Sequence, residues 1–171
     1  DHINKVKVAL DANNRITGLR VDSIANIGSY LSAFSVVTPT ILHAPLLSGC
    51  YKIPSIYTNV KGMATTTAPV DAYRGAGRPE ATYLLERMMD AAAREVGMDP
   101  AEFRRINFIP KDAFPYQTPV ALQYDIGDYE APLDKALEMI DYKDFEARRQ
   151  EAANRGKYRG IGPVSYTHLR A

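Results

Sequence analysis

The feature that most constrains the fold is a change in the spacing of apolar residues near the middle of the chain. In residues 5–10 and 19–27, apolar side chains alternate with polar ones, which is the two-residue period of a strand with one buried face. From Pro79 onward, apolar side chains recur every three or four residues, which is typical of helices. Few strand–helix–strand alternations of the kind that imply a parallel sheet are present. We therefore predict an α+β fold, with a β-rich N-terminal part followed by helices.

The β-rich part contains one clear hairpin and two less regular segments. Residues 11–15 are rich in Asp and Asn and separate the two alternating runs, which should therefore pair as a hairpin. Residues 36–47 are apolar but contain two prolines, and we expect a short helix between loops there. Residues 51–60 resemble a strand, but Pro54 lacks an N–H donor and limits the run to an edge or bulged strand.

Local signals mark where the helices begin and end. Pro79 followed by Glu80 is typical of a first helical turn, and Gly97 is typical of a helix end. Residues 99–102 resemble a capping box with proline at the first helical position. These signals predict helices over residues 79–96, 99–106, 132–140 and 142–155, with a long surface loop over residues 107–131.

Length and composition exclude several classes of protein. The 171 residues suit one domain, and 21 Lys+Arg against 20 Asp+Glu argue against a chain that coats nucleic acid. The single cysteine, Cys50, excludes an internal disulfide framework and fits a reducing compartment. No apolar run is long enough to span a membrane and no leader opens the chain, so we expect a cytoplasmic protein. The start at Asp1 looks like a cut from something longer.

The segment that carries most chemical information is Asp71–Glu80, Asp-Ala-Tyr-Arg-Gly-Ala-Gly-Arg-Pro-Glu. Its two glycines allow the backbone to approach a ligand, and the helix start supplies unpaired N–H groups that suit an oxygen-rich group. Arg74 and Arg78 add positive charge. The segment matches neither a Walker loop nor a dinucleotide fingerprint. On these residues alone, a ligand-binding loop and a solvated loop that caps a helix are equally plausible.

A family resemblance begins at this segment. Residues 72–80 resemble the active-site loop of the molybdenum hydroxylases, which include xanthine dehydrogenase, aldehyde oxidase and the large subunit of aerobic carbon monoxide dehydrogenase. Residues 50–54 and 97–107 are similar to segments that flank this loop in the family, in the same order and spacing. The resemblance implies that residues 1–162 are part of the molybdopterin-binding domain of a catalytic subunit. Residues 163–171 depart from the family and are expected to be an artefactual tail.

The resemblance implies a cofactor and a reaction. Molybdopterin cytosine dinucleotide is expected beside the loop, and no residue of this chain is expected to ligate the metal directly. The implied activity is oxidative hydroxylation of a small molecule, with electrons passed to [2Fe–2S] and FAD subunits of a heterotrimer that is expected to dimerise. The family's general-base glutamate lies outside this chain, so the fragment alone should be inactive and holds no catalytic residue. The expected cofactor-binding residues are Ala72, Tyr73, Arg74, Gly75, Ala76 and Gly77.

Departures from the family narrow the expected substrate. Gly75 stands where enzymes that oxidise carbon monoxide carry a copper-binding cysteine, so no copper is expected. Ala76 stands where xanthine enzymes place a stacking Phe, and Leu42 where they place an orienting Arg. These departures resemble the branch labelled form II carbon monoxide dehydrogenase, whose substrate is expected to be an aldehyde or an N-heterocycle. The expected substrate pocket includes Leu42, Tyr73 and Ala76.

The remaining candidates have structural interpretations. Cys50 has no partner at ligand spacing and is expected to be buried or half-buried, and the three histidines are too scattered in sequence to predict a shared metal site. Residues 114–119 fit a substrate funnel, a subunit contact or a plain surface loop. The methionines of the long helix should fill the core, and the arginine pairs should be solvated or salt-bridged, without binding nucleic acid. These residues are Met88, Met89, Met98, Arg104, Arg105, Arg148 and Arg149.

A second hypothesis belongs to a different class of protein. In it, the chain is a non-catalytic α+β interaction domain whose Arg74–Arg78 loop binds a phosphate or a partner carboxylate.

Overall fold

The computed structural model describes residues 2–162, so the expected artefactual tail and His168 lie outside the described residues. Strands β1 (His2–Leu10), β2 (Ile16–Gly28) and β3 (Ile56–Ala64) form a sheet in the order β1-β2-β3. Strands β1 and β2 are antiparallel, which confirms the predicted hairpin. The Asp11 carboxylate orders its turn by accepting the backbone N–H groups of Asn13 and Arg15 at 2.8 and 2.9 Å.

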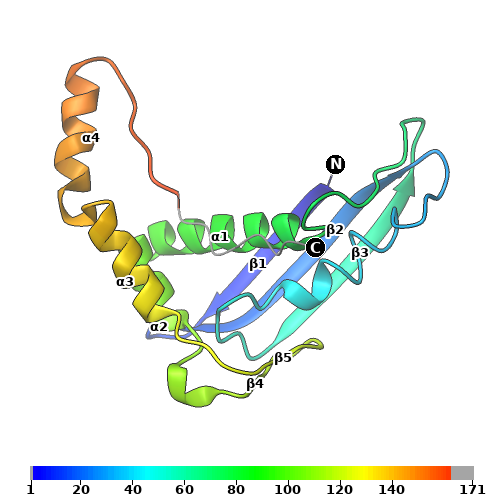
Figure 1. Ribbon diagram of the computed structural model, residues 1–171, viewed down its shortest axis with the longest axis horizontal. Helices are drawn as coiled ribbons and strands as arrows, with labels where there is room; N and C mark the ends of the chain where they lie inside the picture. The colour runs from blue at the N-terminus through cyan, green and yellow to red at the C-terminus, as the bar shows by residue number, and fades with distance from the viewer. Residues whose placement is uncertain (1, 163–171) are drawn as a thin grey trace.

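The second strand pair corrects the sequence prediction. Strands β2 and β3 run parallel, although few strand–helix–strand alternations predicted a parallel pair. Their connection, residues 29–55, consists of turns and the single 3₁₀ turn η1 (Ala44–Leu46), so the expected helix over 36–47 is wrong except for that turn (Figure 1). Because no regular helix makes the crossover, apolar periodicity could not reveal the parallel pair.

Strand β3 is an edge strand, as Pro54 predicted, but its bounds differ from the expected range. It begins two residues after the proline, at Ile56, and runs on to Ala64. Tyr51 instead forms an isolated antiparallel bridge with Phe108. The bridge ties the crossover to the end of the second helix.

The helices follow the predicted order. They are α1 (Arg78–Glu95), α2 (Pro100–Asn107), α3 (Glu130–Met139) and α4 (Phe145–Asn154). Asp99 caps α2 by accepting two backbone N–H groups. The predicted helix over 142–155 is divided, because η3 (Tyr142–Asp144) follows Asp141 at a φ of 50° and precedes α4. The loop over 107–131 contains η2 (Lys111–Ala113) and a small hairpin of β4 (Tyr116–Gln117) and β5 (Gln123–Tyr124).

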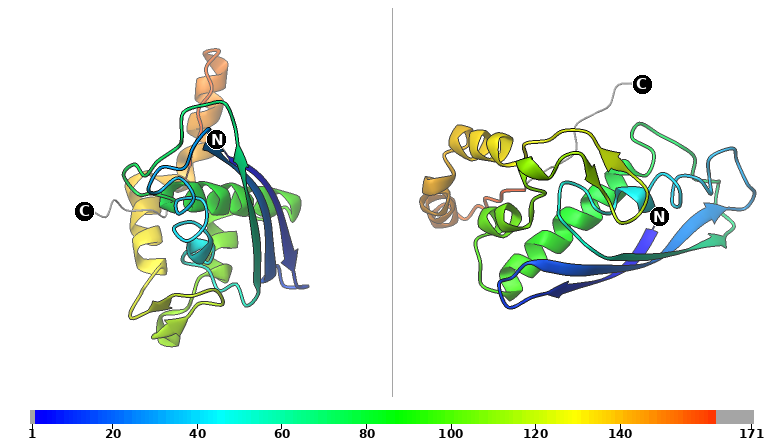
Figure 2. Two further views of the ribbon diagram at one scale, coloured as in Figure 1. Left: turned by 90° about the vertical axis from the view of Figure 1, so that its right-hand side faces the viewer. Right: turned by 90° about the horizontal axis from the view of Figure 1, so that it is seen from below.

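Helix α1 lies across one face of the sheet, which gives a two-layer core (Figure 2). Leu19 and Val21 of β2 and Leu85 and Met89 of α1 belong to this core and are almost fully buried. Met88 is 7% exposed and Met98 packs against the same cluster, so the three methionines fill the core as predicted. No helix within residues 2–162 is both long enough and apolar enough to cross a membrane.

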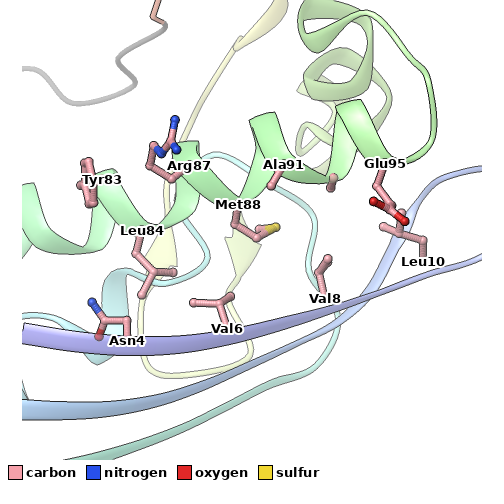
Figure 3. Close-up of a pocket in the computed structure, with 11 residues that line it drawn as sticks. Asn4, Val6, Val8, Leu10, Tyr83, Leu84, Arg87, Met88, Ala91 and Glu95 are labelled. Atoms are coloured by element: carbon pink, nitrogen blue, oxygen red, sulfur yellow. The ribbon is translucent and has the colours of Figure 1, made fainter.

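The core is open along the β1 edge. A groove of about 560 Å³ runs between β1 and α1 and is lined by Val6, Val8, Leu84 and Met88, among others (Figure 3). The inward side chains of β1 are only half-buried, whereas those of the central strand β2 are mostly buried.

A buried ion-pair cluster joins the crossover to helices α1 and α2. The Tyr51 hydroxyl donates to Glu86 at 2.8 Å, and Arg104 donates to Glu86 at 2.8 Å and to Asp90 at 2.9 Å. Burial, followed by the neighbouring Cys50 and Glu86, raises the pKa of Tyr51 well above its usual value, which keeps its proton on the hydroxyl. Arg104 is therefore salt-bridged as expected, but in the core and not on the surface.

The other paired arginines lie at the surface and are also engaged. Arg105 contacts Asp134 at 2.6 Å, and Arg149 contacts Glu146 at 3.1 Å. Arg148 donates to the carbonyl oxygens of Ile140 and Asp141, near the break before α4.

Candidate functional site

The loop between β3 and α1 has an unusual backbone. Gly75, Ala76 and Gly77 are consecutive residues with positive φ angles of 95°, 36° and 87°. Glycine adopts such angles without strain and L-residues rarely do, which explains a Gly-Ala-Gly run at this place. Hydrogen bonds from Ala76 N to the Tyr73 carbonyl (2.9 Å) and from Arg78 N to the Gly75 carbonyl (3.1 Å) close the turn. The sequence therefore specifies a tight left-handed turn directly before the helix.

This turn presents backbone N–H groups to the outside. Within residues 2–162, the N–H groups of Tyr73, Arg74 and Gly75 donate to no acceptor. Residues 71–74 are exposed, and the Tyr73 side chain is 85% exposed. Unpaired donors in a row beside a helix N-terminus favour an oxygen-rich ligand, because the helix dipole adds partial positive charge there.

The crossover segment supports the loop from behind. A Cβ atom at Gly77 would lie 2.5 Å from the Leu42 carbonyl oxygen and 2.6 Å from that of Thr38, so the backbone of Gly77 is seated directly on the turn Thr38–His43. Among the predicted pocket residues, Leu42 therefore contacts the Gly77 end of the loop, through its own backbone carbonyl. Its side chain and that of Ala76 are half-buried, whereas Tyr73 extends away from the protein.

Asp71 fixes the other end of the loop. Its carboxylate accepts the backbone N–H of Ala72 at 2.7 Å. This bond is the largest cause that lowers the pKa of Asp71, because it favours the ionised carboxylate. The Gly77 end of the loop therefore rests on the turn Thr38–His43, and Asp71 orders the other end locally. Sequence reasoning missed this support, since no periodic pattern links residues so far apart.

The other candidate residues do not form a second centre. Cys50 is half-buried, and burial followed by the Glu86 charge raises the pKa of its thiol to about 12, as expected of an unreactive packing residue. His2 and His43 do come together, with ring centroids 6.1 Å apart, although the sequence predicted no link. Within the described part of the chain, no three His, Cys, Asp or Glu side chains are placed to hold a metal ion.

Comparison with known proteins agrees with this arrangement. Residues 1–108 match the family model of the molybdopterin cofactor-binding domain. The chain is 39% identical to the carbon monoxide dehydrogenase large chain of Hydrogenophaga pseudoflava, over 95% of this chain and 21% of that protein. It is 33% identical to the nicotine 6-hydroxylase large subunit of Paenarthrobacter nicotinovorans, over 92% of this chain and 19% of that protein.

Solved structures show the same fold. Quinoline 2-oxidoreductase from Pseudomonas putida 86 superposes with a TM-score of 0.83 at 29% identity, over 91% of this chain and 20% of that one. A Cu,Mo-containing carbon monoxide dehydrogenase superposes with a TM-score of 0.78 at 29% identity, over 92% and 20% of the two chains. The present chain therefore spans about a fifth of the length of these relatives.

The loop, its helix and the matching fold together define a cofactor-binding domain. The chain belongs to the molybdopterin cofactor-binding domain family. The relatives named above are large subunits or chains of oxidoreductases, so they give no support to a non-catalytic interaction domain.

Proposed function

We propose that this chain is one wall of the active site in the catalytic large subunit of a molybdenum hydroxylase, with residues 72–77 holding the molybdopterin cofactor. The observation that carries the proposal is the row of unpaired N–H groups at Tyr73, Arg74 and Gly75, presented by a left-handed turn at a helix start. When bound, the cofactor supplies the two-electron oxidation of a hydroxylation. In this proposal, residues 1–162 form part of the molybdopterin-binding domain, and residues 163–171 are an artefactual tail.

The residues of the loop fit such a group. Free backbone donors suit the oxygen atoms of the cofactor, and Gly75 lets them approach without a Cβ in the way. Arg78 lies with its guanidinium 3.5 Å from the Gly75 carbonyl and adds positive charge behind the turn. Arg74 is exposed and free to meet an anionic part of the cofactor. Residues 72–77 carry no carboxylate, imidazole or thiol, so they would hold the cofactor through hydrogen bonds.

We propose an aldehyde or an N-heterocycle as the substrate, in a pocket that includes Leu42, Tyr73 and Ala76. Gly75 offers no side-chain atom to copper, so we expect no copper in this enzyme. Carbon monoxide is therefore a less favoured substrate, because the enzymes that oxidise it carry a copper-binding cysteine at this position. The names of two relatives refer to nicotine and quinoline, which are N-heterocycles, and that supports the proposal. Another relative is a carbon monoxide dehydrogenase, so carbon monoxide belongs in any substrate panel.

The complete enzyme would extend well beyond this chain. We propose the cytosine dinucleotide form of the cofactor, a heterotrimer with [2Fe–2S] and FAD subunits that dimerises, and a cytoplasmic location. The general-base glutamate would come from another part of the large subunit, so this fragment should not turn over alone.

The test is to express the full-length gene with its neighbouring genes and to measure molybdenum per folded protein and hydroxylase activity. Gly75→Val should abolish both, because a branched side chain at a φ of 95° distorts the turn that carries the donors. Gly97→Val is the matched control: Gly97 also has a positive φ, of 67°, but nothing lies within 4 Å of its Cβ position. Folded wild-type protein without molybdenum, or full activity in Gly75→Val, would contradict the proposal.

A further inference from the structure

Polar atoms of three side chains are buried around the first turn of α1, directly behind the loop. Both ring nitrogens of His43, Oε2 of Glu80 and Oγ1 of Thr38 have no hydrogen-bond partner within residues 2–162. His43 is 0% exposed and Thr38 is 3% exposed. Buried polar atoms in folded proteins are nearly always paired, directly or through an ordered water. Unpaired atoms at one place therefore indicate a polar cluster that an ordered water or a small adjustment completes.

The position of these groups relates them to the loop. Thr38 and His43 bracket the turn on which Gly77 is seated, where the carbonyl oxygens of Thr38 and Leu42 lie within 2.6 Å of the Cβ position of Gly77. His43 directly follows Leu42, whose carbonyl oxygen lies against Gly77, and the Gly77 backbone and the Glu80 carboxylate raise the pKa of its imidazole as neighbours. The ring of His2 stands edge-on to that of His43, at 6.1 Å between centroids, and closes the far side.

The hydrogen-bonding capacities of these groups are complementary. A neutral imidazole has one N–H donor and one acceptor nitrogen. The Gly77 carbonyl and the Glu80 carboxylate are acceptors for the donor, and the Thr38 hydroxyl can donate to the other nitrogen. A small adjustment, or one buried water, would satisfy the ring completely.

We propose that His43 is a positioning residue for the loop: its imidazole links the Thr38–His43 turn to Gly77 and Glu80, and so fixes the direction in which the N–H groups of residues 73–75 point. The expected effect of His43 on catalysis rests on the proposed function. Gly77 is the last of the three left-handed residues, so the position of Gly77 sets the orientation of the whole turn. A displacement of about 1 Å at a reacting centre can lower the rate about a hundredfold.

The charge state of the imidazole agrees with this role. Burial and His2 lower the pKa of His43, while the Gly77 backbone and Glu80 raise it, and the net pKa lies below its usual value. The titratable groups that face the ring are His2 on β1 and Glu80 on α1. His43 is therefore neutral at physiological pH, in the form that both donates and accepts.

The test compares three variants of the full-length protein with its partner subunits. His43→Leu keeps the volume but removes both nitrogens, His43→Gln keeps one donor and one acceptor, and Met89→Ala removes core packing on α1 away from the loop. Met89 is 0% exposed and serves as the stability control. Amide hydrogen exchange is measured at Ala76 and Arg78, whose N–H groups close the turn, together with kcat per bound molybdenum.

We expect His43→Leu to speed exchange at both amides and to lower kcat, each about tenfold, and His43→Gln to restore both to within about threefold. Met89→Ala should lower the melting temperature at least as much as His43→Leu does. It should change neither the amide exchange rates nor kcat more than twofold. The inference is overturned if His43→Leu leaves the exchange rates unchanged, if His43→Gln does not rescue, or if Met89→Ala has the same effect. Exchange is measurable without cofactor, so failure of the proposed function, seen as wild-type protein without molybdenum, stays distinct from failure of this inference.

Discussion

Two polar clusters beside α1 differ in how they are completed. In the ion-pair cluster, Tyr51, Glu86 and Arg104 are almost fully buried and bonded to one another or to Asp90. In the loop cluster, the N–H groups of residues 73–75 have no partner within the described residues, and His43 is buried behind them. A cluster that is satisfied internally stabilises the fold, whereas one with unused donors is shaped for something outside it.

The difference also appears in backbone conformation. The ion-pair cluster joins regular helices, α1 and α2, with ordinary dihedral angles. The loop cluster contains three consecutive positive φ angles and is held by only a few hydrogen bonds at its ends. Unusual backbone geometry is maintained where it has a use, and here it directs the free amides outward.

The largest expected effect is at the ion-pair cluster. Glu86→Ala leaves Arg104 buried with only Asp90 as its carboxylate partner, and should lower the free energy of unfolding by about 3–5 kcal/mol. The measurement is urea unfolding followed by circular dichroism. The control is Glu102→Ala, which removes an exposed pair with Arg105 and should cost less than about 1 kcal/mol. Equal losses in the two variants would show that the buried cluster has no special role in stability.

The second largest effect is a loss of stability at Gly77, which distinguishes a close backbone contact from the strain of a positive φ. Gly77→Ala should lower the free energy of unfolding by about 3 kcal/mol, because the new Cβ meets backbone atoms at 2.5–2.6 Å in addition to the positive φ. Gly97→Ala has a similar φ and open space, and should cost only about 1 kcal/mol. Thermal unfolding of both variants measures the difference. If the two losses are equal, Gly77 is not seated tightly on the crossover turn.

A smaller effect depends on pH and tests the loop cluster. The folded pKa of His43 lies below its unfolded value of about 6.5, so the unfolded chain binds the proton first as pH falls below that value. The wild-type protein should therefore lose stability on acidification below pH 6.5 more steeply than His43→Gln. The free energy of unfolding is measured at pH 7.5 and 5.5, and identical slopes would contradict a buried neutral His43.

Much of the fold could be predicted from sequence because its signals are local. The hairpin follows from alternation around the Asp11 turn, and α1 and α2 follow from apolar spacing with their caps. The parallel pairing of β2 with β3 could not be predicted, since an irregular crossover has no period. Contacts such as the bond from Ile16 N to Asn107 Oδ1, at 2.8 Å, join residues too far apart in sequence for any local pattern to reveal.

The candidate site shows the same limit. The loop itself was predicted from its glycines and arginines, and the structure adds the left-handed run Gly75–Gly77 that explains them. The seating of Gly77 on the turn Thr38–His43 was missed, because it depends on which residues of the crossover fold against the loop. The roles of residues 72–77 and Leu42 toward cofactor and substrate stay predictions.

The smallest expected effect lies at Cys50, beside the ion-pair cluster but outside its bonds. Cys50→Ser should lower the free energy of unfolding by about 1 kcal/mol, because a hydroxyl is costlier than a thiol in a half-buried apolar place. With a thiol pKa of about 12, the wild-type cysteine should also stay almost unreactive toward iodoacetamide at pH 8 until the protein unfolds. Amide exchange in the loop should not change in Cys50→Ser. Rapid alkylation of the folded protein would contradict a buried, unreactive thiol. Faster amide exchange in the loop of the variant would mean that Cys50 couples the two clusters, so that the ion-pair cluster could not be assigned to stability alone.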